Sequence, residues 1–340
     1  MDGEGRAPAA PEAQSSARPV GAERGGDAWW PGRRVLVTGG SGFIGSHLGR
    51  ALAVAGASVV TLDRRLPAPQ DRTGATVAVG DVRDPELVLD LLEREEVDLV
   101  YHLAAQPIME AAVRDPRRTF AVNVDGTTAI AEAVRRAAAD TPIVFASSAA
   151  VYGARGDGEP LREDAASGPM SVYGASKRAA EEVLRGYVDA YGLTVVVCRL
   201  MNTYGPGDRH RSRLVPRAID LLRRREAYHF GARDDGTTQL DFVFVSDVVD
   251  GLLAAGRLAC RRPGHEVVNL GTGRATAVRD VACKLAGVAE RDVEPVFAGP
   301  RRTTPYVKRL DTTHARQVLL WVAQVRIEDG LVDTWTACSR

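Results

Sequence analysis

The sequence predicts an α/β fold in which a doubly wound parallel sheet carries helices on both faces, with a smaller C-terminal α/β lobe. Three observations support this prediction. Short apolar runs alternate with helical patterns of ten residues or more from Arg34 to about Leu200. A glycine-rich turn follows the first run, and the alternation loosens after Leu200. Such alternation is typical of βαβ units, because parallel strands need a crossover connection.

The individual elements follow from apolar runs and the residues that bound them. The run Arg34–Thr38 precedes glycines and predicts a buried strand. A helical pattern covers Phe43–Ala55 and ends at Gly56. The other predicted strands are residues 58–62, 76–79, 97–103, 142–147, 194–199, 242–246 and 266–271. The other predicted helices are residues 85–94, 119–138, 173–191 and 214–224.

The organisation of the chain follows from the same patterns. Residues 1–30 are rich in Ala, Gly, Pro, Glu and Arg and lack periodicity, which predicts a disordered tail. We expect Trp29 and Trp30 to pack on the body of the fold, with contact to a partner as the alternative. Residues 31–200 form the predicted main domain, to which segments near 240–275 return, and residues 201–340 mainly form the smaller lobe.

The composition excludes several classes of protein. The chain has 340 residues, with 44 Lys and Arg against 44 Asp and Glu, so no bulk charge favours nucleic acid or an anionic membrane. No apolar run is long enough to cross a bilayer, and the first thirty residues lack the apolar segment of a secretory signal. We therefore expect a cytoplasmic protein with reduced thiols and no metal site, since its four cysteines are scattered: Cys198, Cys260, Cys283 and Cys338.

The turn after the first strand has the composition of a dinucleotide-binding turn. Gly39, Gly42 and Gly45 allow a tight turn, close approach of the backbone to a pyrophosphate, and close packing of the helix. The helix N-terminus then attracts the pyrophosphate. Asp63 ends the second strand, where its carboxylate can accept hydrogen bonds from the adenosine ribose. Its charge favours NAD over NADP, although the neighbouring Arg64 and Arg65 weakly favour the opposite.

The segments after the third and fourth strands complete this predicted cofactor site. Asp81 and Val82 follow the third strand, where a side chain can reach the adenine. The small residues of His102-Leu103-Ala104-Ala105 end the fourth strand beside the path of the cofactor.

A Tyr, a Lys and a Ser suggest the chemistry. Tyr173 and Lys177 lie four apart at the start of a predicted helix, so both can serve one site. A nearby ammonium favours the phenolate, which can take a proton from an alcohol while hydride leaves its carbon. Ser148 ends the fifth strand, at the edge of the sheet where ligands bind, and can orient the reacting hydroxyl.

Together these motifs resemble the extended short-chain dehydrogenase/reductases, in particular the NAD-dependent sugar epimerase/dehydratase family. The resemblance runs from about Arg34 to Trp335 and also includes Asn123-Val-Asp-Gly-Thr127, Tyr152-Gly153, Arg199-Leu-Met-Asn202, Tyr204-Gly-Pro-Gly-Asp208 and Asp241-Phe-Val-Phe-Val-Ser-Asp247. It implies a Rossmann domain for NAD, a C-terminal lobe for a nucleotide-diphosphate sugar, and a homodimer that pairs through a four-helix bundle.

The resemblance also implies roles for individual residues. The implied catalytic residues are Ser148, Tyr173 and Lys177. The implied cofactor-binding residues are Gly39, Gly42, Phe43, Ile44, Gly45, Asp63, Asp81, Val82, Leu103, Ala104, Ala105, Asn123, Ser147, Tyr173 and Lys177. The expected substrate-binding residues are Gln106, Ser148, Asn202, Arg213, Leu214, Phe230 and Arg301, with Asn202 at the phosphates.

The residues after Ser148 indicate which reaction is favoured. Dehydratases and decarboxylases of the family usually carry an acidic residue there, whereas this chain has Ala149 and Ala150. The chain therefore looks closer to the UDP-galactose and UDP-glucuronate 4-epimerases, whose reaction needs only Ser, Tyr and the cofactor. The alternatives are a 4-ketosugar reductase or dehydrogenase, a dehydratase or decarboxylase that uses Glu110, and a non-catalytic nucleotide sensor.

Some positions depart from the family pattern. Leu240 stands where the family usually has an Arg that binds the diphosphate. Arg301 fits a second family Arg for that group, and we expect Arg213 to supply the missing charge, with a solvated basic loop as the alternative. Ala112 replaces a common Ser. These changes favour an uncommon sugar, such as one from secondary metabolism, chosen by side chains that include Gln106, Ile108, Met109, Met201 and Phe230.

Overall fold

The computed structural model describes residues 29–66, 75–137, 140–153, 158–166, 168–231, 234–300 and 303–339. The predicted disordered tail therefore lies outside the described residues except for its last two. Trp30 is only 1% exposed within the main core, and the ring of Trp29 packs edge-on against it with 4.5 Å between centroids. The prediction that these two tryptophans pack on the body of the fold is confirmed.

A seven-stranded parallel sheet forms the centre of the main domain. Its spatial order is β3-β2-β1-β4-β5-β6-β9. The strands are β1 (Arg34–Thr38), β2 (Ser58–Asp63), β3 (Thr76–Val79), β4 (Leu99–His102), β5 (Ile143–Ser148), β6 (Val195–Leu200) and β9 (His265–Leu270). All neighbouring pairs are parallel, which confirms the predicted doubly wound sheet. The chain order reverses between β1 and β4, and ligands bind at such a switch point.

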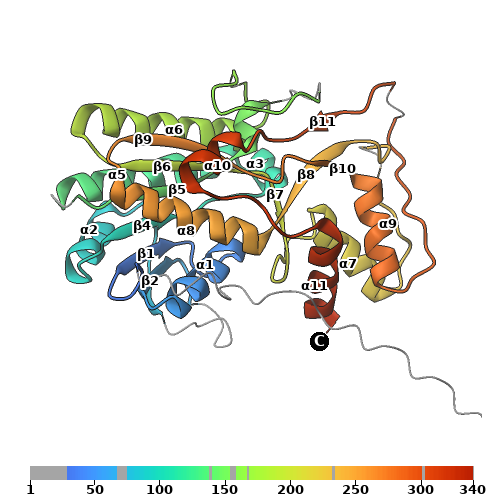
Figure 1. Cartoon of the computed structure of the whole chain (residues 1–340), viewed down its shortest axis with the longest axis horizontal. Helices are drawn as coiled ribbons and strands as arrows, with labels where there is room; N and C mark the ends of the chain where they lie inside the picture. Colours follow the sequence, from blue (N-terminus) through green and yellow to red (C-terminus); the bar gives the residue numbers. More distant parts are fainter. Residues whose placement is uncertain are drawn as a thin grey trace, which may run out of the picture.

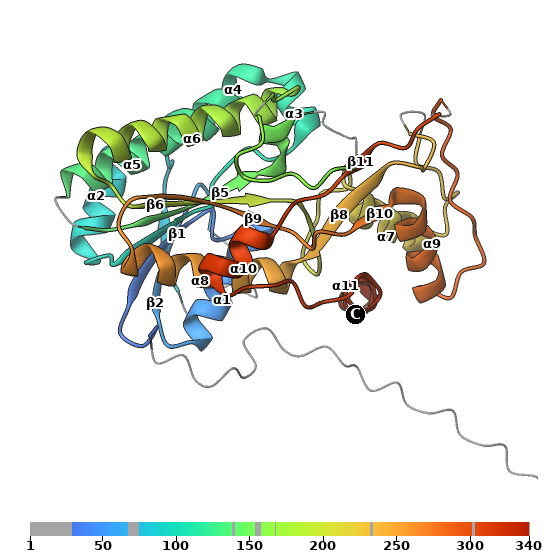
Figure 2. The ribbon, with the colours of Figure 1, turned by 45° about the horizontal axis from the view of Figure 1, so that its top comes forward.

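Helices cover both faces of this sheet (Figure 2). One layer contains α1 (Phe43–Val54), α8 (Val245–Arg261) and α10 (Thr313–Leu319); the other contains α2 (Pro85–Arg94), α5 (Gly126–Arg136) and α6 (Val172–Tyr191). Successive strand residues alternate between the two cores: Val35 and Val37 face the first layer, and Leu36 faces the second. Apolar burial on both faces explains why these strands read as continuous apolar runs.

Two predicted elements differ markedly from the structure, whereas the bounds of the other predicted strands and helices differ by at most two residues. The predicted helix 119–138 is divided into α4 (Pro116–Phe120), a π-helical turn η2 (Ala121–Asp125) and α5. The π turn carries Asn123, whose side chain bonds to residues distant in the sequence, and helical periodicity cannot reveal such a bond. The predicted strand 242–246 ends at Phe244, because Val245 begins α8, with Asp247 in its first turn.

The smaller lobe is built on a second sheet (Figure 1). Its central strand β8 (Gln239–Phe244) pairs with β7 (Asn202–Tyr204), β10 (Ala275–Ala277) and β11 (Val307–Lys308). The helices α7 (Leu214–Arg224), α9 (Val278–Val288) and α11 (Ile327–Ser339) pack on it around a separate apolar core. Of the segments near 240–275, α8 and β9 return to the main domain, whereas β8 belongs to the lobe.

The remaining helix, α3 (Met109–Arg114), follows β4 and contacts α4 and α6. In the part of the chain that the structure describes, no helix combines the length and apolar character needed to cross a membrane.

Candidate functional site

The glycine turn between β1 and α1 has a geometry that larger residues cannot adopt. Gly39 has a φ of +72°, and a Cβ atom there would lie 2.8 Å from the backbone nitrogen of Ala104. A Cβ atom on Gly45 would lie 2.1 Å from the carbonyl oxygen of Gly39. Gly42 occupies the N-cap of α1, and no side chain caps this helix start. The turn is therefore a backbone cradle at a helix N-terminus, and it fits a pyrophosphate.

Asp63 closes one side of this cradle from the end of β2. Its Oδ2 accepts a hydrogen bond of 2.7 Å from the backbone N–H of Ser41. Burial raises the pKa of Asp63, and the hydrogen bonds from Ser41 and Gly40 oppose that shift. The carboxylate is thus fixed to the turn and lies where a ribose hydroxyl could donate to it.

Two of the side chains that follow β3 and β4 bond within the protein. Asp81 forms a bidentate ion pair with Arg83, with distances of 2.9 and 2.7 Å. Val82 is buried at 6% exposure against Gly126. Gln106 donates from its side chain to the carbonyl oxygen of Ile108 and accepts from the N–H of that residue. Gln106 therefore shapes its own loop through this side chain.

A buried polar chain holds the end of β4. His102 lies between the hydroxyls of Thr38 and Thr127, at 2.8 and 3.0 Å from its two ring nitrogens. The Thr38 hydroxyl also accepts from the N–H of Ala104 at 3.2 Å. Burial lowers the pKa of His102 to about 3, so the ring is neutral and serves as a structural bridge. It fixes Leu103, Ala104 and Ala105 beside the glycine turn.

Asn123 connects this loop to α6, the helix that carries Tyr173 and Lys177. It is 1% exposed, accepts from the N–H of Gln106 at 2.7 Å, and donates to the Ser176 hydroxyl at 2.9 Å. In this structure the side chain of Asn123 therefore links the loop that contains Gln106 to α6 through hydrogen bonds.

Ser148 and Tyr173 come together at the carboxyl edge of the sheet. Ser148 ends β5, and its Oγ accepts a 3.1 Å hydrogen bond from the N–H of Ala150. Tyr173 lies in the first turn of α6, whose start Ser171 caps by accepting from Gly174 N–H. Burial raises the pKa of the Tyr173 phenol, while a hydrogen bond with Ser148 and the charge of Arg213 both lower it. These two neighbours stabilise the phenolate that proton transfer requires.

Lys177 lies one turn along α6 and is 2% exposed. Its Nζ donates to the carbonyl oxygen of Ala146 at 2.8 Å and lies 4.6 Å from the ring centroid of Phe145. Burial lowers the pKa of Lys177 to about 7, and the carboxylate of Glu181 opposes this shift. Its ammonium therefore titrates near neutral pH.

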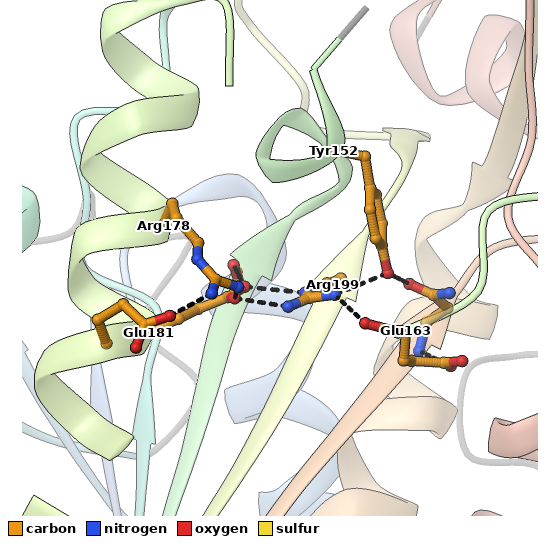
Figure 3. Close-up of polar contacts among 8 residues, drawn as sticks. Tyr152, Glu163, Arg178, Glu181 and Arg199 are labelled. Atoms are coloured by element: carbon orange, nitrogen blue, oxygen red, sulfur yellow. Dashed lines mark hydrogen bonds and ion pairs between the residues drawn. The ribbon is translucent and has the colours of Figure 1, made fainter. Parts of the chain in front are cut away.

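Sequence reasoning missed a buried ion pair between β6 and α6 (Figure 3). Arg199 on β6 and Glu181 on α6 are each 5% exposed at their side chains and lie 2.8 Å apart. Glu181 also accepts from the hydroxyl of Ser147, so this hydroxyl, predicted to bind the cofactor, serves the ion pair in this structure. The sequence signal for this ion pair was Arg199 itself, which lies in a predicted buried strand, because a buried charge requires a partner.

The same Arg199 reaches the turn that follows Ser148. Its Nη1 donates to the Tyr152 hydroxyl at 2.9 Å and to the carbonyl oxygen of Glu163 at 2.9 Å. The Tyr152 hydroxyl donates to Asn269 Oδ1 at 2.7 Å (Figure 3). The network ties β6, β9 and the turn into one rigid support.

The predicted substrate-binding residues fall into separate groups. Arg213 precedes α7, is 35% exposed at its side chain, and pairs with the buried carboxylate of Asp208 at 3.2 Å. Because its charge lowers the pKa of Tyr173, Arg213 lies in the neighbourhood of that phenol. Asn202 is exposed at the start of β7, and its Nδ2 donates to the carbonyl oxygen of Asp241 at 3.1 Å.

The other predicted substrate residues are less accessible or lie outside the described residues. Phe230 stacks on Phe297 with 4.9 Å between ring centroids, and Leu214 packs on the same lobe core. Met201 is buried at 9% exposure. Arg301 lies outside the described residues. Glu110, the alternative acid, is exposed in the first turn of α3.

Comparisons with known proteins identify the family of this chain. The model of the NAD-dependent epimerase/dehydratase family matches residues 35–271. A UDP-glucose 4-epimerase of Mycolicibacterium smegmatis is 36% identical over 311 residues, which cover 88% of this chain and 97% of the relative.

Solved structures are similar over the same extent. A UDP-glucose 4-epimerase of Thermotoga maritima, solved with UDP-glucose, matches with a TM-score of 0.82 and 30% identity over 90% of this chain and 98% of that one. A UDP-glucose 4-epimerase of Thermus thermophilus, solved with NAD, matches with a TM-score of 0.79 and 32% identity over 89% and 98%.

Proposed function

Because this chain belongs to the NAD-dependent epimerase/dehydratase family, we propose that it is a nucleotide-diphosphate-sugar 4-epimerase. One observation carries the proposal. Ser148, Tyr173 and Lys177 gather at the carboxyl edge of the sheet, while the positions after Ser148 are Ala149 and Ala150. These groups suffice to remove and return a proton at one alcohol, and neither alanine can supply the further acid that loss of water requires.

The residues of the glycine turn fit NAD as the resident cofactor. Gly39 and Gly45 permit the tight turn, because a Cβ atom on either would meet backbone atoms of Ala104 or Gly39, and Asp63 offers a carboxylate to the ribose. The same carboxylate repels a 2′-phosphate, which favours NAD over NADP. When bound, NAD supplies the hydride acceptor and donor for carbon 4 of the sugar.

The protein residues orient the 4-hydroxyl of the sugar and transfer its proton. Tyr173, as the phenolate, takes the proton of the 4-hydroxyl, and Ser148 donates to the same oxygen and orients it. The charge of Arg213 favours the phenolate. We propose that the ammonium of Lys177, when it is protonated, does the same. After the 4-keto sugar has turned in the site, Tyr173 returns the proton to the oxygen. The product is the C4 epimer, and its mass is unchanged.

We propose that Arg213 and Asn202 bind the diphosphate of the substrate, together with Arg301. Gln106, Leu214 and Phe230 complete the proposed sugar and nucleotide contacts, and the departures at Leu240 and Ala112 favour an uncommon sugar. Arg213→Ala should weaken substrate binding by roughly tenfold or more, because a charge-assisted hydrogen bond to phosphate is lost. The matched control is Arg211→Ala, because Arg211 is exposed and pairs with Asp220. Equal affinity of both variants by calorimetry would contradict this role.

We further propose that the enzyme is a cytoplasmic homodimer. The outward faces of α5 and α6, which lie side by side, offer a surface for a four-helix contact (Figure 2), and Tyr191 on α6 is 59% exposed. Light scattering of the purified protein should give twice the mass of the chain. A monomeric mass at micromolar concentration would refute the dimer.

The decisive experiment uses the purified protein without added cofactor. A panel of UDP-, GDP- and dTDP-sugars is incubated with it, and the products are followed by NMR and mass spectrometry. A product of unchanged mass with inverted C4 supports the epimerase. Loss of water or carbon dioxide refutes it, and turnover that depends on added NADH or NADPH identifies a reductase, since an epimerase recycles its cofactor.

A further inference from the structure

A buried lysine from the substrate lobe contacts the turn that follows the catalytic serine. Lys308 lies on β11 and is 7% exposed. Its Nζ donates to the carbonyl oxygen of Ala149 at 2.9 Å and to that of Gly153 at 2.8 Å. These two carbonyls lie at the two ends of the short helical turn η3 (Ala149–Tyr152), whose N-cap is Ser148. One ammonium therefore spans the whole turn.

The same turn also contacts the helix of the catalytic tyrosine. A Cβ atom on Gly174 would lie 2.6 Å from the carbonyl oxygen of Ala150, so the turn and the start of α6 are in direct backbone contact. Gly174 follows Tyr173 in the chain. The turn thus contacts both Lys308 and the first turn of α6. Its position sets the distance between Ser148 and Tyr173.

The lysine also joins the two lobes. Lys308 pairs in register with Leu240 of β8, the central strand of the second sheet, and β11 lies beside β8 (Figure 1). The turn belongs to the main domain, because it continues from β5. The hydrogen bonds from Lys308 therefore attach the catalytic edge of the main sheet to the substrate lobe.

Burial of an ammonium costs free energy, so its presence here indicates that the charge contributes something that an apolar side chain would not. Burial lowers the pKa of Lys308 to about 8. An apolar side chain would pack beside the neighbouring apolar cluster, which includes Ala149, Val151 and Leu310, without that cost. What the ammonium adds is a pair of directional, charge-assisted hydrogen bonds to one turn.

We propose that Lys308 is a positioning residue, which fixes the Ala149–Gly153 turn so that Ser148 stays aligned with Tyr173. This inference rests on the proposed 4-epimerase function for its kinetic consequence, but the holding of the turn is independent of the reaction. A displacement of about 1 Å at a reacting group can lower a rate by about 100-fold. The residue therefore acts on turnover more than on substrate binding.

The test compares three variants of the full chain. Lys308→Met removes the charge while nearly keeping the length of the side chain. Lys308→Arg keeps a cation that can donate to both carbonyls. Lys284→Met is the matched control, because Lys284 is an exposed lysine on α9 that pairs with Glu328.

Two measurements are made on each variant. The first is kcat and KM with a nucleotide sugar that the wild type epimerises. Lys308→Met should lower kcat by about 10- to 100-fold with KM within about threefold, and Lys308→Arg should recover part of the loss. The second is hydrogen–deuterium exchange, which should accelerate in the segment 149–153 of Lys308→Met and remain unchanged in β1 and α5. Lys284→Met should match the wild type in both.

The outcomes separate the possible failures. Unchanged exchange in the segment 149–153 overturns the proposal, because Lys308 then does not hold the turn. Faster exchange with an unchanged kcat overturns it as well, since the turn would then not position Ser148. Faster exchange throughout the chain shows general destabilisation and also overturns it. A wild type that epimerises no sugar refutes the proposed function, while the exchange measurement still decides whether Lys308 holds the turn.

Discussion

At Tyr173, the surroundings decide how readily a phenol loses its proton. Burial opposes ionisation, whereas the hydrogen bond with Ser148 and the charge of Arg213 favour it. Proton transfer of this kind contributes about 10²–10⁴-fold to a rate. Tyr173→Phe should therefore lower kcat by about 10³-fold and leave NAD and substrate affinity within a few-fold.

The variant Tyr191→Phe is the control, because Tyr191 is 59% exposed at the far end of the same helix. Product formation is followed by NMR, and ligand affinity by calorimetry. A Tyr173→Phe protein that turns over as fast as the control would remove Tyr173 from the proposed chemistry.

Lys177 makes stability depend on pH in a direction that can be derived. The folded protein holds the pKa of Lys177 at about 7, below its usual value of 10.5, because the charge is buried. At low pH both folded and unfolded chains carry the charge, and the folded chain bears its full desolvation cost. Between about pH 7 and pH 10 the unfolded chain binds more protons, so this cost disappears as the pH rises.

We therefore expect the wild type to gain about 2–3 kcal/mol of unfolding free energy, relative to Lys177→Met, between about pH 6 and pH 9. Urea unfolding of both proteins at the two pH values measures this difference. The comparison with Lys177→Met cancels the pH dependence of the other groups. A difference that stays constant, or that changes in the opposite direction, would contradict a buried ammonium at this position.

At the scale of elements, the junction of β1 and α1 depends on glycines, which have no side chain to obstruct the turn. Gly45→Ala would place a Cβ atom 2.1 Å from the carbonyl oxygen of Gly39 and must displace the turn. We expect loss of at least about tenfold in NAD affinity and about 1–3 kcal/mol in stability, as for an overpacked core position. Calorimetry measures the NAD affinity, and thermal unfolding measures the stability.

Gly186 provides the control within a helix. It lies inside α6, where an added Cβ atom would meet nothing within 4 Å. Gly186→Ala should stabilise the protein by about 0.5–1 kcal/mol, because alanine restricts the unfolded chain and favours the helix. Equal losses of NAD affinity in both variants would show that helix composition, and not the cradle, controls binding.

Elements with one dominant period were predicted closely, and elements that depend on distant partners were not. The prediction for α2 gave its bounds, since Asp84 caps its start and Pro85 occupies its first position. The prediction of a single helix at 119–138 did not include the π turn. That turn places Asn123, whose side chain forms hydrogen bonds with Gln106 and Ser176, and these partners are distant in the sequence. Ser147 was predicted to bind the cofactor, and the structure adds that its hydroxyl bonds to Glu181, which comes from another element.

At the scale of the whole molecule, the two lobes share the chain in an interleaved way. The first core contains apolar residues of β1, α1 and β4 together with residues of α8, β9 and α10, which all follow Leu200. A chain that ends at Leu200 would lose α8 and α10 from one face of the sheet and would expose the edge of β6, which pairs with β9 along six residues.

We expect this shortened chain not to fold cooperatively. Near-ultraviolet circular dichroism and thermal unfolding of the full and shortened chains measure this, since loss of fixed packing removes the cooperative transition. A sharp transition in the shortened chain would show that residues 31–200 form an independent domain.

The sequence by itself determined the parallel sheet, the glycine turn and the placement of Tyr173 and Lys177 one turn apart on one helix. Each of these depends on local periodicity or on short spacings along the chain. The tertiary structure alone decided the partners of buried charges. Arg199 meets Glu181, and Lys308 meets the turn after Ser148, because strands and helices far apart in the chain converge there. A buried charge must find its partner in space, and the sequence order of two residues does not specify their distance.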